Sequence, residues 1–593
     1  MAANPAQLNN EPAPGQPLLP DAHGSNLFDA DPGFRGLLSL YLDPGLLAHL
    51  LPHFERLGSL AGGRLDQLAL TADKNPPVLH DRKRTGEDAQ WIDKHPAYRS
   101  LEEIAFGEYG LAAMSHRADV LGWPGKMPPV VKYALTYLYV QAEFGVCCPL
   151  SMTDATTRTL SKFADPALVA RYFPGLTSQD LDTLTQGAMF MTEQGAGSDV
   201  GATLTRAESR GDHWLLTGDK WFCSNADAGV ALVLARPEGA PGGTRGLSLF
   251  LLPRVLPDGS PNRYRIVRLK EKLGTRDMPS GEITLDGAVA YMVGDAQRGF
   301  AQMADMINMS RLSNGMRAAG MMRRALSESL FISRRRSAFG KNLVELPLMR
   351  RQLLKLMLPT EAARSMMLYT ATELAGADAG DEAARKRVRI LTPLIKFRAC
   401  RDARRVTGDA MEVRGGAGYI EEWSDARLVR DAHLGSIWEG TSNIVAQDVL
   451  RAIRREGSLD ALRPALEAMV AGVTHAGLRD ALSASLARAC DFAAASAQSD
   501  DAAHARQAAT GLYYAAAAAI LASEGTRLAR TGDARRLLIA ALANEHRLRA
   551  RDPLRPTRAS LEGACADALL TESPVAPALA DALLSTDFFP AKN

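Results

Sequence analysis

The spacing of apolar residues changes twice along this 593-residue chain, and the two changes limit the folds it can adopt. From about 46 to 185, and again from about 297 onward, apolar residues recur every three or four positions, as in helices. Between 186 and 295 short alternating segments are separated by Gly and Asp turns, which indicates an all-β domain. This order is not the strand–helix alternation of a doubly wound nucleotide-binding sheet, so any bound nucleotide needs a different scaffold.

A chain of this length is too long for one compact core, since domains usually hold roughly 100–200 residues. The changes of pattern divide it into five expected segments. These are an extended N-terminal arm over 1–45, an N-terminal helical domain over 46–185, a central β-domain over 186–295, a helical bundle domain over 296–455 and an Ala-rich helical extension over 456–593. The predicted fold class is therefore α+β and multidomain.

Composition excludes several classes of function. The chain has 69 Lys and Arg against 67 Asp and Glu, so no strong overall field attracts nucleic acid or membrane. Six cysteines without a CxxC pair or a His cluster predict buried free thiols and no metal site. The N-terminus does not read as a signal peptide, and the most apolar later stretch, Leu512–Ala522, is shorter than the about 20 residues that cross a bilayer. We expect a cytoplasmic protein without a membrane span.

Five short segments carry residues suited to ligand binding. In Met191–Asp199 (MTEQGAGSD) the glycines let backbone N–H groups approach a ligand, and the hydroxyls can form hydrogen bonds with it. Gly218–Asn225 (GDKWFCSN) places an aromatic ring beside a hydroxyl, which suits stacking on a flat ligand. The others are Arg336–Gly340 (RSAFG), Arg414–Tyr419 (RGGAGY) and Ser436–Ile444 (SIWEGTSNI). Each alone is more often an ordinary turn or strand, so their occurrence together, in this order, is what matters.

With Lys272–Arg276 (KLGTR), these segments resemble the ordered motifs of the acyl-CoA dehydrogenase family, over roughly residues 90–455. The resemblance implies a helical N-terminal domain, a central β-domain and a C-terminal four-helix bundle. It also implies bound FAD and oxidation of an acyl-CoA thioester to the trans-2-enoyl-CoA. Asn-Glu-Pro in the arm, Ser25–Phe28 (SNLF), the Ile-Trp-Glu-Gly form and the helical extension further resemble the AidB branch, whose members are flavoproteins associated with the response to alkylating agents.

By this resemblance Glu439 holds the position of the catalytic base, which removes a proton from the carbon next to the thioester carbonyl. The family's alternative base position, on the long helix after the β-domain, is Ser310-Arg311 here, and a serine cannot act as that base. The resemblance also places Ser198, Arg311, Trp438 and Gly440 on the substrate side, with an acyl-CoA as the expected substrate.

The resemblance further implies two groups of cofactor-binding residues. The group expected to line the flavin is Met191, Thr192, Gly197, Ser198, Phe222, Ser224, Thr441 and Asn443. The group expected to reach the FAD of a neighbouring subunit is Arg336, Phe339, Glu412, Gly415 and Gly416, and an Arg guanidinium suits a pyrophosphate. Sites shared in this way imply at least a dimer and, by family habit, a homotetramer built as a dimer of dimers. The expected electron acceptor is an electron-transfer flavoprotein or a similar partner.

Four positions differ from the common family pattern. Glu412 and Asn443 each replace a Gln, Phe222 replaces a Trp, and Trp438 replaces a Tyr beside the base. The bulkier Trp438 is expected to narrow the acyl pocket.

The C-terminal extension leaves the function open. Between Arg527 and Arg558 nine arginines stand against three acidic residues, and a subset could contact a phosphate backbone, namely Arg535, Arg536, Arg547, Arg549 and Arg551. A helical face whose Arg stems cover apolar surface is the commoner explanation. Three functions therefore compete: an acyl-CoA dehydrogenase, a DNA-associated flavoprotein of the alkylation response with little dehydrogenase activity, and a non-catalytic acyl-chain binder.

Overall fold

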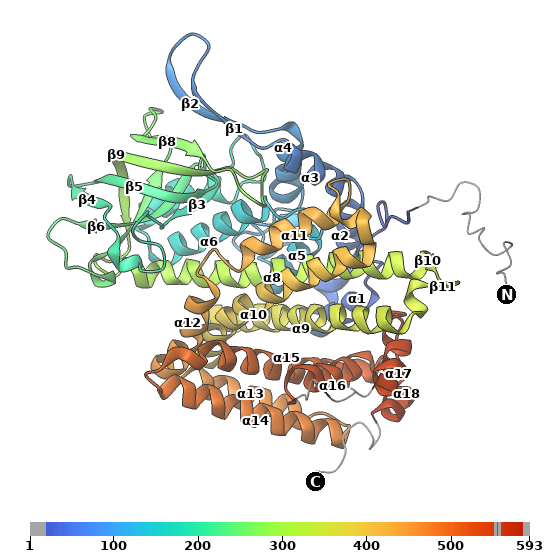
Figure 1. The fold of residues 1–593 in the computed structure, drawn as a ribbon. Coiled ribbons are helices and arrows are strands. Elements are labelled where there is room, and N and C mark those ends of the chain that lie inside the picture. The colour runs from blue at the N-terminus through green and yellow to red at the C-terminus, as the bar shows by residue number, and fades with distance from the viewer. Residues whose placement is uncertain (1–18, 551–553, 555–558, 585–593) are drawn as a thin grey trace.

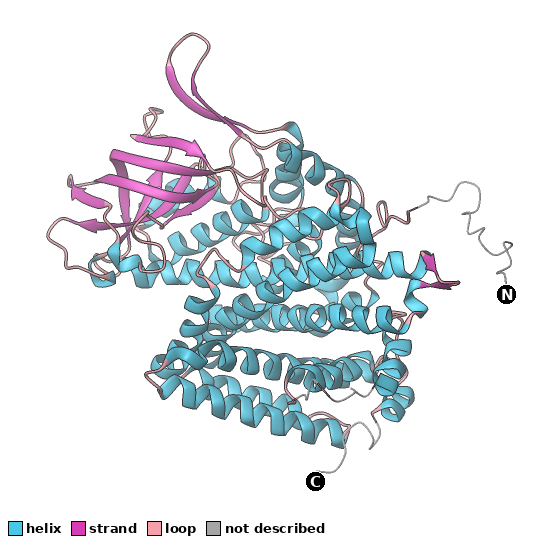
Figure 2. Cartoon of the chain, viewed as in Figure 1, coloured by secondary structure: helices cyan, strands magenta, loops and turns pink. Residues whose placement is uncertain are grey.

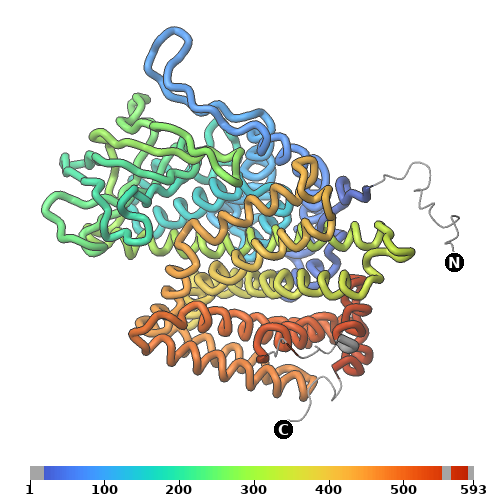
Figure 3. Tube along the Cα trace, in the orientation of Figure 1, coloured from blue at the N-terminus to red at the C-terminus, as the bar shows by residue number. Residues whose placement is uncertain are grey.

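The structure is a computed structural model and describes residues 19–550, 554 and 559–584. A β-rich domain lies at one end of a large helical body, and the C-terminal helices form a further layer beneath that body (Figures 1 and 2). The chain passes from helices to the β-domain, back to long helices and then to the extension, as the tube in Figure 3 traces. The predicted fold class is therefore confirmed.

The N-terminal domain consists of seven α-helices and one β-hairpin. Its elements are α1 (Pro32–Tyr41), α2 (Pro44–Gly62), α3 (Arg64–Lys74), β1 (Val78–Arg82), β2 (Asp88–Asp93), α4 (Pro96–Glu102), α5 (Pro129–Tyr139), α6 (Cys147–Phe163) and α7 (Pro166–Leu176). The antiparallel β1–β2 hairpin was not expected in this helical segment. Its turn contains Gly86, whose φ of +96° favours glycine.

Part of the expected N-terminal arm is helical rather than extended. Helix α1 begins with Pro32 and buries Phe34, Leu37 and Leu38 on one face. Phe34 packs edge-on against Phe54, with ring centroids 6.2 Å apart. The three-and-four spacing of these apolar residues explains the helix, so the prediction of an extended arm is wrong for this stretch. Residues 1–18 of the arm lie outside the described residues.

The β-domain contains seven strands that close on themselves. They are β3 (Gly187–Phe190), β4 (Arg206–Ser209), β5 (Trp214–Ser224), β6 (Val230–Pro237), β7 (Ser248–Pro253), β8 (Tyr264–Leu269) and β9 (Ser280–Val293). The order is β3-β6-β4-β5-β9-β7, β8 also pairs with β9, and the pairing of β6 with β7 completes a small barrel. Alternating side chains such as Leu216, Phe250 and Ile283 fill its interior.

The C-terminal half is helical except for one tight hairpin. The bundle domain contains α8 (Gly299–Arg335), β10 (Ser337–Ala338), β11 (Lys341–Asn342), α9 (Pro347–Asp378), α10 (Glu382–Arg414), α11 (Ser424–Gly435) and α12 (Ser442–Glu456). The extension contains α13 (Ser458–Ala471), α14 (Ala476–Gln498), α15 (Ala505–Ala529), α16 (Arg535–Arg547), α17 (Ala559–Leu569) and α18 (Pro577–Leu583). Helix α15 packs on α9, α10 and α12, which joins the extension to the bundle (Figure 1).

Buried ion pairs tie together segments that are far apart in sequence. Asp31, just before α1, forms ion pairs with Arg323 of α8 (3.3 Å) and Arg364 of α9 (2.5 Å). Arg323 also pairs with Glu572, in the turn between α17 and α18, at 2.6 Å. These groups are nearly inaccessible to solvent, so removing one partner would leave a charge without compensation.

Two arginines of the C-terminal window do not lie on the phosphate-facing surface that its composition suggested. Arg535 and Arg536 are 2% and 3% exposed. Arg536 pairs with Glu361 at 2.7 Å and Glu524 at 2.8 Å, which fixes α16 against α9 and α15. The prediction that these two residues contact DNA is therefore wrong, because both are buried: Arg536 is neutralised inside the protein, and the Arg535 guanidinium donates to the Leu569 carbonyl oxygen at 3.3 Å. Arg551, Arg555 and Arg558 lie outside the described residues.

All six cysteines are buried free thiols, as expected. Within the described ranges, no group of His, Cys, Asp and Glu side chains is arranged to hold a metal ion. None of the helices in those ranges has the length and apolar character needed to cross a membrane.

Candidate active site

Glu439 lies in the short turn between α11 and α12, in a backbone conformation that is rare for its residue type. Its φ is +54°, and that of Gly440 is +100°. Non-glycine residues seldom adopt positive φ, and such strain is concentrated at functional sites. Two buried cations hold the turn by its backbone: Lys396 Nζ donates to the Gly440 carbonyl oxygen at 2.5 Å, and Arg311 Nε donates to the Glu439 carbonyl oxygen at 3.4 Å.

The carboxyl group of Glu439 is placed to accept a proton. Its Oε2 atom is buried and has no hydrogen-bond partner among the described residues. Burial raises the pKa of Glu439 above its ordinary value, and a hydrogen bond from Ser310 together with the charges of Lys396, Arg311 and Arg317 opposes that rise. A desolvated carboxylate with a raised pKa and a free oxygen is suited to act as a general base.

Trp438 and Phe144 form an aromatic wall beside this carboxyl group. Their rings stack with centroids 5.8 Å apart and an interplanar angle of 20°. The Arg317 guanidinium lies 5.0 Å from the centre of the Trp438 ring, and Trp438 Nε1 is buried without a hydrogen-bond partner in the described part of the chain. The two rings place apolar surface near the Glu439 carboxyl group, and this surface excludes water from the carboxyl group.

One side of the Gly-rich loop is fixed by hydrogen bonds to Glu193, and the other side is exposed. Glu193 is buried and accepts from Lys220 Nζ at 2.7 Å, from the Leu204 backbone N–H at 2.6 Å and from Thr205 Oγ1 at 2.5 Å. The loop therefore turns its other side outward: Gly197 and Ser198 are exposed, and a Cβ added at Gly197 would meet no atom within 4 Å. Its backbone is available to a ligand.

Strand β5 ends beside the Gly-rich loop and Cys148. The Trp221 N–H donates to the Thr192 carbonyl oxygen at 2.8 Å, which joins the strand to the loop. The next side chain, Phe222, is 58% exposed. At the end of the strand Ser224 faces Cys148: burial raises the pKa of that thiol to about 11, the charge of Glu439 adds to the rise, and the hydrogen bond with Ser224 opposes it. Ser224 therefore lies beside Cys148, whose thiol is within range of the Glu439 charge.

A second group of predicted cofactor-binding residues lies at the other end of α8. Arg336 Nη1 donates to the Arg414 carbonyl oxygen at 2.9 Å, beside Gly415. Phe339, at the tip of the β10–β11 hairpin, is 94% exposed, and Glu412 and Gly416 are also exposed. Helix α8 has 37 residues, so it is roughly 55 Å long. It begins at the β-domain and ends at this hairpin (Figures 1 and 3), so one chain cannot bring both groups to the same nucleotide.

The remaining predicted residues lie near the base. Thr441 and Asn443 are exposed at the start of α12, two and four residues after Glu439. Arg311 is directed at Asp448, 2.5 Å away, as well as at the Glu439 backbone, so in this structure it braces the turn. Met191 and Thr192 are half-buried where the Gly-rich loop leaves β3.

Sequence reasoning missed the charged side chains that support the site, namely Glu193, Lys220, Arg317 and Lys396. Lys396 is buried, and burial lowers its pKa to about 8. The only sequence signal for such residues is a charge at an inward-facing position of an otherwise apolar pattern, as Lys220 has in β5.

The site residues fit a flavin dinucleotide. The exposed Phe222 ring offers a flat apolar surface, the open backbone at Gly195 and Gly197 lets N–H groups approach polar atoms, and Trp438 Nε1 lacks a hydrogen-bond partner among the described atoms. Arg336 supplies a fixed positive charge suited to a pyrophosphate. A large planar ligand uses the features near the β-domain, and Arg336, at the other end of α8, suits the charged tail of a ligand bound by another copy of the chain.

Comparisons with known proteins identify the family of this chain. Models of the acyl-CoA dehydrogenase middle and C-terminal domains match residues 188–288 and 297–454, and that of the adaptive response protein AidB N-terminal domain matches 18–183. The putative acyl-CoA dehydrogenase AidB of Escherichia coli strain K12 is 34% identical over 429 residues, covering 70% of this chain and 75% of that protein.

Two solved structures are similar over most of the chain. Bd2924 in its apo form has 32% sequence identity and a TM-score of 0.77, covering 86% of this chain and 100% of that one. Caenorhabditis elegans ACDH-11 in complex with C11-CoA has 27% identity and a TM-score of 0.81, covering 94% and 96%. This chain belongs to the acyl-CoA dehydrogenase family, in its AidB-like branch, and its cofactor is FAD.

Proposed function

We propose that this protein oxidises an acyl-CoA thioester to its α,β-unsaturated product, with Glu439 as the base. The observation that supports this most is the Glu439 carboxyl group, whose Oε2 atom is buried without a partner among the described residues in a strained turn fixed by Lys396 and Arg311. A carboxylate on the surface would not be buried, and its turn would not be fixed by hydrogen bonds from buried cations. The ACDH-11 relative was solved with C11-CoA, which supports an acyl-CoA as the substrate class here.

The residues divide the reaction between them. Glu439 Oε2 takes the proton from the carbon next to the thioester carbonyl, and the Glu439 backbone N–H is positioned by the braced turn to donate to the developing enolate oxygen. Trp438 and Phe144 keep water from the carboxylate, and Gly440, with a φ of +100°, allows the tight turn next to it. FAD, when bound, supplies the acceptor for the hydride that leaves the adjacent carbon.

On the cofactor side we assign the residues that cluster near the β-domain to the flavin half and those beyond α8 to a neighbouring subunit. The first set is Met191, Thr192, Gly197, Ser198, Phe222, Ser224, Thr441 and Asn443, with Ser198 also near the substrate. The second set is Arg336, Phe339, Glu412, Gly415 and Gly416. The length of α8 between the two sets supports at least a dimer and fits a homotetramer. Electrons then leave to an electron-transfer flavoprotein or a similar acceptor.

Anaerobic titration of the purified FAD-loaded protein with acyl-CoAs tests this proposal. We expect at least one acyl-CoA to bleach the visible flavin absorbance band stoichiometrically and to yield the enoyl-CoA, detected by mass spectrometry. Binding of acyl-CoAs without bleaching would refute the dehydrogenase proposal in favour of an acyl-chain binder. Failure of the protein to take up FAD would remove its basis altogether.

Replacing Ser310 with Ala is expected to shift the acid limb of the kcat/KM profile to higher pH, by about one unit. The Ser310 hydroxyl bonds the ionised Glu439 carboxyl and lowers its pKa, so removing the hydroxyl raises that pKa. Glu439 must be ionised to act as the base, so the rate falls below the new pKa and keeps its plateau above it.

The matched control for this profile is Ser329→Ala. Ser329 is a buried serine of the same helix whose hydroxyl donates to the Ala325 carbonyl oxygen. An acid limb that stays in place in Ser310→Ala, or one that moves equally in the control, would contradict the role given to Ser310.

A further inference from the structure

Three of the four most completely buried arginines in the described chain have carboxylate partners. Arg323 pairs with Asp31 and Glu572, Arg324 with Asp66 and Glu328, and Arg364 with Asp31 and Glu361. These pairs compensate the large cost of removing a guanidinium from water. The fourth, Arg317, is 1% exposed, and no carboxylate of the described chain lies within ion-pair distance of it.

Most of the Arg317 guanidinium has nothing to bond. Nη2 donates to Ser151 Oγ at 2.7 Å, but Nε and Nη1 are buried with no hydrogen-bond partner among the described residues. The faces of Phe144 and Trp438 lie 5.5 and 5.0 Å from its central carbon. Aromatic faces attract a cation, but they do not satisfy N–H donors. The structure thus leaves a buried charge and two donor groups for a ligand.

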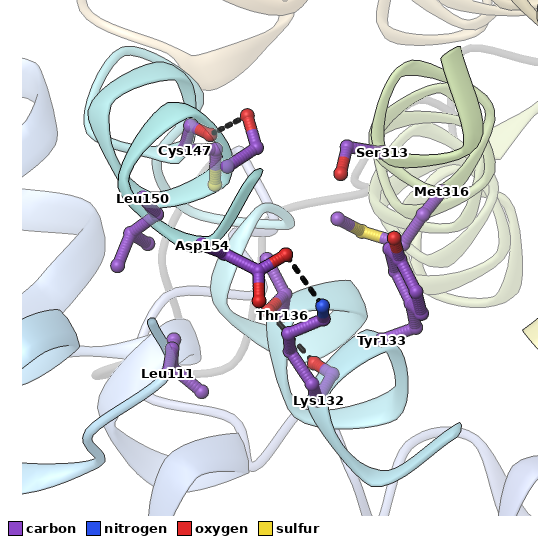
Figure 4. A pocket seen from close by; sticks show the side chains of 10 residues that line it. Leu111, Lys132, Tyr133, Thr136, Cys147, Leu150, Asp154, Ser313 and Met316 are labelled. Carbon is purple, nitrogen blue, oxygen red and sulfur yellow. Dashed lines mark hydrogen bonds and ion pairs between the residues drawn. The ribbon is translucent and has the colours of Figure 1, made fainter. Parts of the chain in front are cut away.

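Arg317 lies between the base and an inner cavity. Ser310, Ser313 and Arg317 follow at spacings of three and four on one face of α8, and Ser310 bonds the Glu439 carboxyl. The cavity lies between α5, α6 and α8, and both Ser151 and Ser313 line it. Figure 4 shows Ser313 on the side of α8. Its volume of about 20 Å³ holds one or two water molecules. A chain that extends inward from the base therefore meets Arg317 before it meets the cavity.

The cation that lines this cavity, Lys132, is already neutralised. Lys132 Nζ donates to Asp154 at 2.6 Å, as Figure 4 shows, and His116 bonds the same carboxylate at 2.9 Å. Cys147, which also lines the cavity, has a pKa raised by burial, so its thiol is neutral. Arg317 is left as the cation without a counterion on the path from the base, so an anion in the ligand would complete the site.

We propose that the acyl group of the substrate carries a carboxylate and that Arg317 binds it, so that the preferred substrates are ω-carboxyacyl-CoAs. The inference rests on the proposed function, because it takes the space beside Glu439 as the acyl site. A carboxylate there accepts from the free Nε and Nη1 donors and neutralises the guanidinium. A plain hydrocarbon chain would cover these donors and leave them unbonded, which costs affinity.

Binding by the Glu439→Gln holoprotein, in which turnover is blocked, measures this preference through perturbation of the flavin spectrum. The ligands are glutaryl-, adipyl- and suberyl-CoA against pentanoyl-, hexanoyl- and octanoyl-CoA of the same length, with ω-hydroxyhexanoyl-CoA added. We expect at least one carboxyacyl-CoA to bind about tenfold or more tightly than its uncharged match. A second substitution, Arg317→Met, should abolish this preference by weakening the binding of the charged ligand. Arg317→Lys should restore part of the preference.

Each failure has a separate meaning. Equal binding of charged and uncharged chains, or a preference that survives Arg317→Met, overturns the inference. A hydroxyacyl ligand that binds as tightly as its carboxylate match also overturns it, because charge would then be irrelevant. If hexanoyl-CoA bleaches the wild-type flavin and no carboxyacyl-CoA is preferred, the proposed function stands and the inference fails. If no acyl-CoA binds the FAD-loaded protein, both fail. If Arg317→Met does not retain FAD, the inference is still decided in the Glu439→Gln protein that keeps Arg317, by comparing each carboxyacyl-CoA with its uncharged match.

Discussion

Substituting Gln for Glu439 is expected to lower the rate of flavin reduction by acyl-CoA by about 10²–10⁴-fold while leaving bound FAD in place. The amide keeps the size of the side chain and its contact with Ser310, but it cannot accept the substrate proton. The backbone contacts from Lys396 and Arg311 to this turn do not depend on the carboxyl group, so its shape should persist. Stopped-flow absorbance of the flavin under anaerobic conditions measures the rate directly.

Glu422→Gln is the matched control. Glu422 is an exposed glutamate just before α11, whereas Glu439 follows this helix. Replacing Glu422 should leave the rate of flavin reduction unchanged. Reduction at the wild-type rate by Glu439→Gln would show that another group removes the proton, and the assignment of the base would then have to be abandoned.

Replacing Arg536 with Met is expected to destabilise the protein by about 3 kcal/mol or more. Arg536 is 3% exposed and joins Glu361 of α9 to Glu524 of α15. Its loss leaves Glu524 without an ion-pair partner among the described residues, and leaves Glu361 to Arg364, which also pairs with Asp31. Because a chain with several domains need not unfold in one step, the measurement combines thermal unfolding with limited proteolysis that monitors α13–α18.

Arg530→Met supplies the comparison. Arg530 is exposed on the neighbouring turn, and changes at such surface positions usually fall within about 0.5 kcal/mol. If Arg536→Met unfolds and is cleaved like wild type, the ion pairs of α16 do not hold the extension to the bundle. Any study of nucleic-acid binding by this region should therefore change exposed arginines such as Arg527, Arg530 and Arg549, because changing Arg536 would test stability instead.

The site residues were proposed from the order of several motifs and the family resemblance that this order carries, because the Gly-rich loop and the Trp-Glu-Gly turn are each ordinary turns when taken alone. Local backbone shape adds one signal, since Gly440 has a φ of +100°, which favours glycine. The β-domain was evident without the resemblance, because alternation with period two is a local property. The roles assigned to individual cofactor residues stay predictions.

The parts that escaped prediction depend on partners remote in the sequence. Nothing near Arg536 indicates that Glu361 neutralises it, so an arginine-rich window appears basic whether or not its charges are exposed. Arg317 could not be distinguished from a solvated residue for the same reason. Helix α1 is a different case: Phe34, Leu37 and Leu38 have helical spacing, but the surrounding Pro and Gly residues outweighed that short signal.

The sharing of Arg323 between Asp31 and Glu572 has a consequence for how the chain folds during synthesis. Asp31 leaves the ribosome early and Glu572 very late, whereas Arg323 lies in the core of α8 between them. The central bundle therefore carries an incompletely balanced buried charge until α17 and α18 have been translated and have docked. Loops as long as this are slow to close, so the nascent protein should remain a substrate for chaperones until its last helices arrive.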